Sequence, residues 1–386
     1  MSASPLGRLV ELPVTETDTS RADLERHRRW LADAARTAAF CDAVAAAVGP
    51  GAVFADLGCG TGLLSLVARR AGARRAFAVE RGAIIGLARQ IVSANHATGI
   101  EFIHGDSLDV ALPEPADVVA MDSIGDAGYS PSLVACLCDA RERWLRPGGV
   151  MIPASIDICG VVIEAPDHIA DVPLPDRGLA PLDLAGVSRL SALTLIGRTT
   201  FATADPSHIA FDATLVVTRS GAARGLGLCF SAVMLDRDAP IVLTNDPTAP
   251  VHSVRDAEFL PFGATVAVGV GDRIHVRFTA DAVVDSWRYE IVVSSHGGDV
   301  RHEHQVRSAQ DATGPAAPSR RPSVDAVPML HAVGVAARDV LTRAASGLSL
   351  ADLAEGVVTH HADVAHRRAA ARQFVRECLS APRRRR

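Results

Sequence analysis

Short apolar runs alternate with longer stretches of helical spacing along the first 153 residues. The longer stretches carry apolar residues every three or four positions at 61–72 and 84–99, and an alanine-rich stretch at 23–48 predicts a helix broken once. The short runs between them are typical of buried strands: AVFADLG, RAFAVE, EFIHGD and DVVAMD. Strands and helices that alternate in this way predict an α/β fold, a Rossmann-like sheet of parallel strands joined by crossover helices, over residues 1–153.

The pattern changes after this unit. Between residues 154 and 306 the chain is rich in β-branched runs with little helical spacing, which predicts an antiparallel β barrel or sandwich. Residues 174–193 interrupt it with a pattern that predicts a helical arm. Residues 307–323 are small, polar and proline-containing, which predicts a linker, and 324–386 predict a small helical domain.

Composition excludes several classes of protein. The formal net charge is −5 with both signs mixed along the chain, so nothing indicates a nucleic-acid partner. Seven cysteines without C-x-x-C spacing favour reduced thiols over a disulfide framework or a zinc site. No apolar run has the length of a signal sequence or a membrane span. We therefore expect a soluble cytoplasmic protein that holds no metal and binds no membrane.

A glycine-rich turn follows the first predicted strand. The sequence VFADLGCGTGLLS places Gly58, Gly60 and Gly62 between a strand and a helix, where backbone N–H groups can approach a ligand. Such a turn alone also occurs in dinucleotide enzymes, or serves only to tighten packing. However, Asp56 before the turn would repel a pyrophosphate, and Glu80 at the end of the next strand is placed to accept ribose hydroxyls. The pattern therefore favours S-adenosylmethionine over NAD.

Residues 27–306 resemble the catalytic core of the protein arginine methyltransferases. The family's helix signature is kept in HRRWLADAART at His27, Leu31, Asp33, Arg36 and Thr37, with Trp30 in place of methionine. The glycine turn and the segments IVSANHATGIEFIHGDSLDVALP and ARERWLRPGGVMIP continue the match, while GLAPLDLAGVSRL and TAPVHSVRDAEFLP are similar to the dimerisation arm and the barrel histidine loop. The resemblance implies a class I methyltransferase, S-adenosylmethionine as cofactor, and a homodimer.

The resemblance also implies roles around the cofactor. Arg36 would pair with the methionyl carboxylate, a bidentate contact suited to a guanidinium, and Glu80 would hold the ribose. Asp106 and Ser107 would lie near the adenine, although Leu108 stands where the family has an acidic residue.

A histidine of the barrel is expected to meet the first helices. His252 matches the family's barrel histidine and would form an ion pair with Asp33, although the match slips by one residue and Ser253 stands at the family's tryptophan. The alternative is that His252 is an ordinary exposed loop residue.

The loop after the strand DVVAM departs from the family. There, two glutamates clamp a substrate guanidinium; here Asp122 takes the first position and Pro131 the second, and Asp126 lies off the expected register. Burying a guanidinium with unpaired donors in a closed site costs roughly several kcal/mol. We therefore expect an acceptor other than arginine: an amine, imidazole, hydroxyl or carboxylate. Tyr129 either caps the acceptor pocket or only packs.

The C-terminal unit adds a hypothesis about the substrate. The helical order of 324–386 is similar to small winged-helix-like domains that bind leader peptides of ribosomally made natural products, and a helical cap or dimer contact is the alternative. We expect a methyltransferase that acts on a peptide or small molecule. Two alternatives stay open: a true protein arginine methyltransferase, and a non-catalytic scaffold that binds the cofactor.

Overall fold

The computed structural model describes residues 21–164, 179–308 and 352. The chain divides into two compact units, Met1–Gly314 and Pro315–Arg386, and every element below belongs to the first. The predicted helical domain at 324–386, apart from residue 352, and nearly all of the predicted linker at 307–323 lie outside the described residues.

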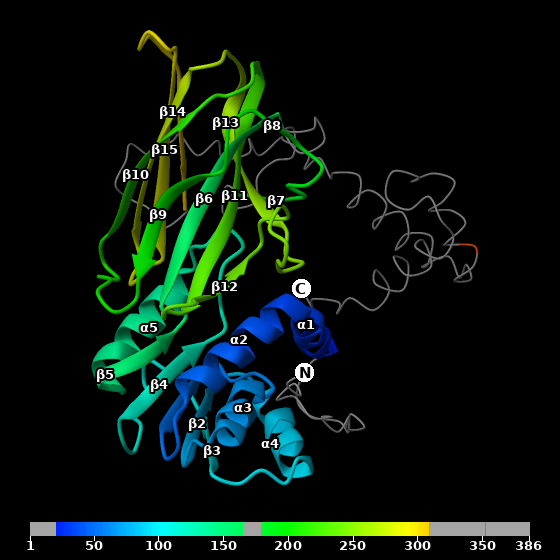
Figure 1. Cartoon of the computed structure of the whole chain (residues 1–386), viewed down its shortest axis with the longest axis vertical. Coiled ribbons are helices and arrows are strands. Elements are labelled where there is room, and N and C mark those ends of the chain that lie inside the picture. Colours follow the sequence, from blue (N-terminus) through cyan, green and yellow to red (C-terminus); the bar gives the residue numbers. More distant parts are fainter. Residues whose placement is uncertain (1–20, 165–178, 309–351, 353–386) are drawn as a thin grey trace, which may run out of the picture. The chain divides into compact units, whose positions relative to one another are not determined.

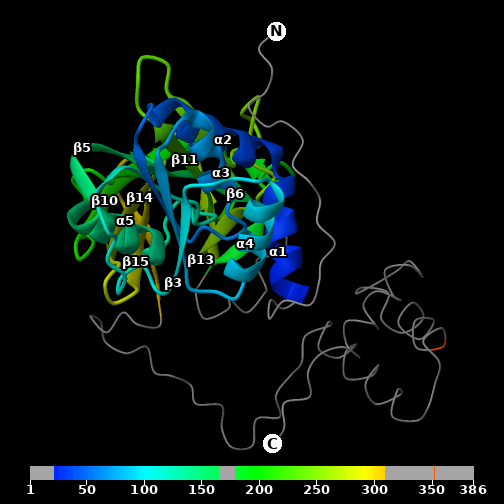
Figure 2. The ribbon, with the colours of Figure 1, turned by 90° about the horizontal axis from the view of Figure 1, so that it is seen from below.

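Five parallel strands form the first sheet, in the order β3-β2-β1-β4-β5. Helices α3 (Leu63–Ala71) and α4 (Ile85–Ala94) lie on one side of this sheet and α5 (Pro131–Arg143) on the other (Figure 2). Because helices cover both faces, the central strand is buried throughout, which explains its continuous apolar run. The strands are β1 (Val53–Leu57), β2 (Arg75–Glu80), β3 (Ile100–His104), β4 (Ala116–Met121) and β5 (Leu145–Ile152). The predicted Rossmann-like sheet is confirmed.

Two helices precede the sheet, α1 (Arg21–Ala32) and α2 (Ala34–Ala47), and the break between them has a local cause. Asp33 has extended backbone angles, and its Oδ1 accepts from the backbone N of Arg36 at 3.1 Å. Asp33 is thus the N-cap of α2, a position where aspartate satisfies an unpaired amide of the first helical turn.

The rest of the described chain is antiparallel β structure in two sheets (Figure 1). A four-stranded sheet has the order β10-β14-β15-β16, and a larger sheet has the order β7-β13-β11-β6-β8, with β12 on β11 and β9 on β6. The bounds are β6 (Ser155–Glu164), β7 (Ala180–Leu182), β8 (Ser188–Arg189), β9 (Thr194–Thr200), β10 (Ile209–Val216), β11 (Gly221–Leu235), β12 (Ile241–Thr244), β13 (Ala257–Val268), β14 (Arg273–Asp281), β15 (Ser286–Ser294) and β16 (Val300–Arg307). This agrees with the predicted barrel or sandwich.

One apolar core runs from the parallel sheet into the β domain. Phe40 of α2, Phe54 of β1, Phe230 of β11 and Phe262 of β13 belong to it, and each is at most 1% exposed. Since helix α2 packs against strands of both regions, the two halves share buried surface rather than meeting through a linker.

The predicted helix at 174–193 is wrong for its described part. Residues 179–193 contain β7 and β8, which pair with β13 and β6, while 165–178 lie outside the described residues. Pro181 and Gly186 disfavour a helix here. Leu182 and Leu184, 1% and 2% exposed, bury alternate side chains against Phe259, a spacing of two that suits extended chain.

Candidate active site

The candidate site lies where the sheet order reverses between β1 and β4. Asp56 is the penultimate residue of β1, and Asp122 directly follows β4, which pairs with β1. Ligands of open α/β sheets bind outside the carboxyl ends of the strands at such a point. The topology therefore brings the two predicted carboxylates to one edge.

The glycine turn has the backbone conformation that its sequence predicts. Gly58, Gly60 and Gly62 have φ of 66°, 53° and 79°, values that other residues rarely adopt. Glu80 fixes this turn, because its Oε2 accepts from the backbone N of Gly60 at 3.1 Å and its Oε1 from that of Gly82 at 2.6 Å. The carboxylate of Glu80 is thereby held beside the turn with lone pairs to spare.

Asp56 is almost fully buried beside the glycine turn. It is 2% exposed, and its Oδ2 accepts from the N and Oγ of Ser65 in α3, at 3.0 and 2.7 Å. Burial raises the pKa of Asp56 to about 7, although the Ser65 hydrogen bonds oppose the rise. Asp56 thus ties β1 to the helix after the turn.

A small cavity of about 70 Å³ lies over the glycine turn, lined by α1, the start of α2 and Asp122. Arg36 and Asp122, which the sequence places in different roles, meet here: Nη2 lies 2.6 Å from Oδ2. Arg36 also donates from Nη1 to the carbonyl of Trp30 at 3.1 Å, and its guanidinium lies over the Trp30 ring. Burial raises the pKa of Asp122, and the charge of Arg36 opposes that rise. Nε of Arg36 and Oδ1 of Asp122 are buried with no hydrogen-bond partner among the described residues.

His27 closes one side of this small cavity. A Cβ placed on Gly60 would lie 2.9 Å from Cε1 of His27, so glycine is required for the helix to approach the turn. Burial lowers the pKa of His27 and favours its neutral form.

Asp106 and Ser107 lie away from the small cavity. Asp106 accepts from Arg81 Nη1 at 3.3 Å and from the backbone N of Leu108 at 3.1 Å. The Ser107 hydroxyl donates to the sulfur of Cys136 in α5 at 3.4 Å. A contact of Asp106 and Ser107 with the adenine of the cofactor remains a prediction.

The contact between the barrel and α2 is made by a different residue than expected. Ser253, 1% exposed, donates its hydroxyl to Oδ2 of Asp33, and the backbone N of Val254 donates to the same oxygen at 3.3 Å. His252 instead has its Nδ1 2.9 Å from the carbonyl of Ala249. The predicted His252–Asp33 ion pair is therefore wrong. The one-residue slip in the loop puts Ser253 at the contact.

The loop after β4 is also held by the barrel. Arg255 donates from Nε to Oδ1 of Asp126 and from Nη1 to the carbonyl of Ile124, both at 2.6 Å. Asn245 donates to the carbonyls of Asp126 and Asp256, each at 2.9 Å. Neither Arg255 nor Asn245 is predicted from the sequence. Arg255 lies in TAPVHSVRDAEFLP, the segment similar to the barrel histidine loop, and Asn245 precedes that segment.

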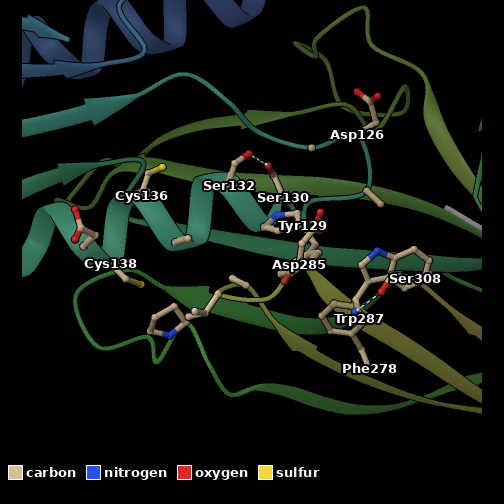
Figure 3. A pocket seen from close by; sticks show the side chains of 18 of the residues that line it. Asp126, Tyr129, Ser130, Ser132, Cys136, Cys138, Phe278, Asp285, Trp287 and Ser308 are labelled. Atoms are coloured by element: carbon tan, nitrogen blue, oxygen red, sulfur yellow. Dashed lines mark hydrogen bonds between the residues drawn. The ribbon is translucent and has the colours of Figure 1, made fainter. Parts of the chain in front are cut away.

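A larger cavity, of about 1060 Å³, lies on the other side of this loop (Figure 3). It is lined by residues 125–132, the outer face of α5 and the turn between β14 and β15. Tyr129 lies between these elements, with its ring 5.2 Å from that of Phe278 in an edge-on arrangement. Its hydroxyl is buried with no partner in the described part of the chain, and burial raises its pKa. Tyr129 therefore packs on the barrel and lines the cavity, with its hydroxyl buried.

Carboxylates outnumber guanidinium groups among the side chains that line the larger cavity, although four of the carboxylates are ion-paired with arginines: Asp106, Asp126, Asp139 and Glu142. Six carboxylates and two guanidinium groups line this cavity: Asp106, Asp126, Asp139, Glu142, Glu258 and Asp285, with Arg81 and Arg255. The described residues include no group of three or more His, Cys, Asp or Glu that could hold a metal, and no helix among them is long and apolar enough to cross a membrane.

Comparison with known proteins gives one consistent result. No protein-family model matches the chain. It is 30% identical over 186 residues to "Probable protein arginine N-methyltransferase 6" of Arabidopsis thaliana, covering 46% of this chain and 43% of that protein. It is 27% identical over 298 residues to "Probable protein arginine N-methyltransferase 3" of the same plant, covering 64% and 49%. The chain thus spans less than half the length of these curated relatives.

Solved structures agree in fold over a longer stretch. The Trypanosoma brucei PRMT1 enzyme-prozyme complex matches with a TM-score of 0.64 at 19% identity, covering 73% of this chain and 98% of that one. Protein arginine methyltransferase 10 of Arabidopsis thaliana matches with a TM-score of 0.64 at 20% identity, covering 74% and 97%. The parallel sheet, the β domain and these matches together show that the chain has the fold of the protein arginine methyltransferase structures to which it is similar.

Proposed function

We propose that this protein is an S-adenosylmethionine-dependent methyltransferase whose acceptor is a nucleophile other than a guanidinium, on a peptide or a small molecule. Of the classes left open by the sequence, the excess of carboxylates over guanidinium groups around the larger cavity favours an amine or imidazole over a carboxylate, because like charges repel.

The residues over the glycine turn fit the cofactor. The unpartnered Nε of Arg36 suits a carboxylate, and Glu80 retains acceptor capacity for ribose hydroxyls. Gly58 leaves open space where a side chain would otherwise stand. The similar T. brucei complex contains AdoHcy, the demethylated cofactor, which supports the same ligand here.

The cofactor supplies a methyl group on a positively charged sulfur. The acceptor's lone pair forms the new bond to the methyl carbon while the carbon–sulfur bond breaks, so the acceptor must lose its proton. Asp122, whose pKa is raised, is placed to take that proton from an ammonium or imidazolium. The remaining contribution of the chain is to align the acceptor and exclude water.

One observation carries the exclusion of arginine: Asp126, the other carboxylate of the loop, is bound by Arg255 of the same chain. Pro131, at the second position of the family's clamp, has neither a carboxylate nor an N–H. Only Asp122 remains for an acceptor, and only through its unpartnered Oδ1, because its Oδ2 is paired with Arg36. A single carboxylate can satisfy an ammonium, which is a compact point charge, but leaves most donors of a guanidinium unpaired.

Arginine methylation is the second candidate, and the names of the similar plant proteins favour it. A peptide acceptor bound through a leader sequence rests on the pattern of residues 324–386, which lie almost entirely outside the described part.

The test is label transfer from methyl-labelled S-adenosylmethionine to a panel of otherwise identical peptides that carry lysine, histidine, serine, aspartate or arginine. Product masses and fragment spectra identify the methylated atom. We expect methylation of the lysine or histidine peptide, and its loss in Asp122→Asn. Methylarginine as the main product overturns the proposal. If the protein binds the cofactor but methylates none of the peptides, and if Asp122→Asn causes no loss of function, the results support a scaffold that binds the cofactor.

A further inference from the structure

The most informative contact outside the cofactor cavity is the one between Arg255 and the loop after β4. Arg255 uses three of its nitrogens: Nε and Nη2 approach Oδ1 of Asp126, and Nη1 binds the carbonyl of Ile124. In this arrangement a carboxylate and a backbone carbonyl bind one guanidinium. It resembles what a substrate arginine would require from the same loop.

The position of this pair makes it relevant to acceptor choice. Asp126 and Arg255 both line the larger cavity, and their side chains are 43% and 24% exposed. Asp126 lies four residues after Asp122, and Figure 3 shows its carboxylate at the far end of the loop from α5. The carboxylate is therefore accessible from the cavity except where Arg255 covers it.

We propose that Arg255 is a specificity-determining residue, a guanidinium of the chain itself that occupies Asp126 and so excludes an arginine side chain from the acceptor cavity. This inference rests on the proposed function. Arginine would then be excluded by a group that blocks Asp126, and not only by the absence of a second carboxylate from the loop. Of the two carboxylates that the loop holds, Asp126 is covered by Arg255, and Asp122 keeps only its Oδ1 without a partner.

The electrostatics give the direction of the effect. With Arg255 in place, an incoming guanidinium meets a neutralised Asp126 and a positive charge beside it. Without Arg255, Asp126 loses this arginine, whereas Asp106, Asp139 and Glu142 keep the arginines with which they are paired. An ammonium acceptor, which needs only Asp122, should be much less affected than a guanidinium.

The experiment measures binding of N-acetyl-arginine amide and N-acetyl-lysine amide by calorimetry, with AdoHcy at saturation, to the wild type and to Arg255→Met. We expect Arg255→Met to bind the arginine probe about tenfold more tightly than the wild type, and the lysine probe within about threefold. Arg255→Lys keeps a cation near Asp126, so we expect little gain for arginine.

Two further variants separate this effect from damage to the loop. Adding Asp126→Asn to Arg255→Met should abolish the gain, because the freed carboxylate is the proposed binding group. Arg198→Met removes a comparable bidentate pair with Asp157 in the barrel, at 2.6 and 2.8 Å, and should change neither probe. If Arg255→Met unfolds in a thermal melt, Arg255→Gln keeps a donor for the Ile124 carbonyl and is the variant to measure.

Equal affinity of the arginine probe for the wild type and a folded Arg255→Met or Arg255→Gln overturns this inference, as does a gain that survives Asp126→Asn. Neither result touches the proposed function, which fails instead if the wild type converts an arginine peptide to methylarginine.

Discussion

The ion pair between Arg36 and Asp122 leads to a prediction about cofactor affinity whose sign is unusual. If Arg36 binds the cofactor's carboxylate, it must weaken or leave its contact with Asp122, which is 2.6 Å away. Replacing Asp122 by asparagine removes a competing charge, so the variant should bind AdoHcy more tightly, although it lacks a residue of the active site.

The structure bounds the size of this effect. The Arg36 side chain is 8% exposed and that of Asp122 is 24% exposed, so the pair is only partly screened by solvent. Removing one partner of a fully buried pair costs about 3–5 kcal/mol, but here the amide of asparagine still accepts a hydrogen bond and Trp30 retains its contact. We therefore expect Asp122→Asn to destabilise the free protein by about 1.4 kcal/mol. Arg36 regains this free energy when it binds the carboxylate of AdoHcy, so AdoHcy should bind about tenfold more tightly.

The assay is calorimetric titration with two ligands, AdoHcy and 5′-methylthioadenosine, which lacks the amino-acid end. Asp122→Asn should tighten the first and leave the second unchanged, since only the first has a carboxylate for Arg36. Asp157→Asn, which breaks the Arg198 pair in the barrel, is the matched control and should alter neither. Weaker binding of AdoHcy alone in Asp122→Asn refutes the competition and indicates instead that Asp122 holds the cofactor's ammonium. Equal changes for both ligands also refute the competition, because they would not depend on the amino-acid end.

Three further predictions follow from other contacts. Glu80→Ala should weaken AdoHcy binding at least about tenfold by calorimetry, because it loses a ribose acceptor and frees the glycine turn; unchanged affinity would remove Glu80 from the site. Gly128→Ala should lower the free energy of unfolding in urea by about 2–4 kcal/mol, because its Cβ would lie 2.8 Å from the carbonyl of Asp157. Gly51→Ala, at a similar positive φ but in open space, should lose clearly less. Asp56 has a pKa of about 7 in the folded protein, above its ordinary value, so its protonated form stabilises the fold and that contribution is lost as pH rises. The stability of the wild type relative to Asp56→Asn should therefore fall by about 2 kcal/mol between about pH 5.5 and about pH 8, and a pH-independent difference would contradict the raised pKa.

The cofactor side of the site was predictable because its signals are local. The glycine turn lies between a strand and a helix that are adjacent in sequence, so Gly58, Gly60 and Gly62 and the neighbouring Glu80 could be placed by spacing alone. The break at Asp33 was equally local, since the capping bond spans only three residues.

The barrel side was not predictable, because its contacts join distant segments. Ser253 meets Asp33 across 220 residues, and Arg255 meets Asp126 across 129. In a loop, a shift of one residue changes which side chain makes the contact, and no periodic pattern fixes the register.

The error at 179–193 had a detectable signal. Leu182 and Leu184 alternate with exposed Pro181 and Asp183, which is the period of a strand, and Pro181 opposes a helix. The helical interpretation of 174–193 gave no weight to this short alternation, which the described residues follow.

The loop that carries Ser253 and Arg255 also has a consequence for engineering by recombination. It touches the start of α2 through Asp33 and the loop after β4 through Asp126. A chimera that exchanges only the β domain with that of another enzyme would thus inherit a foreign loop against native helices. Such a chimera should stay active only when the donor enzyme also supplies its own residues at position 33 and at positions 124–126, so that they match the incoming loop.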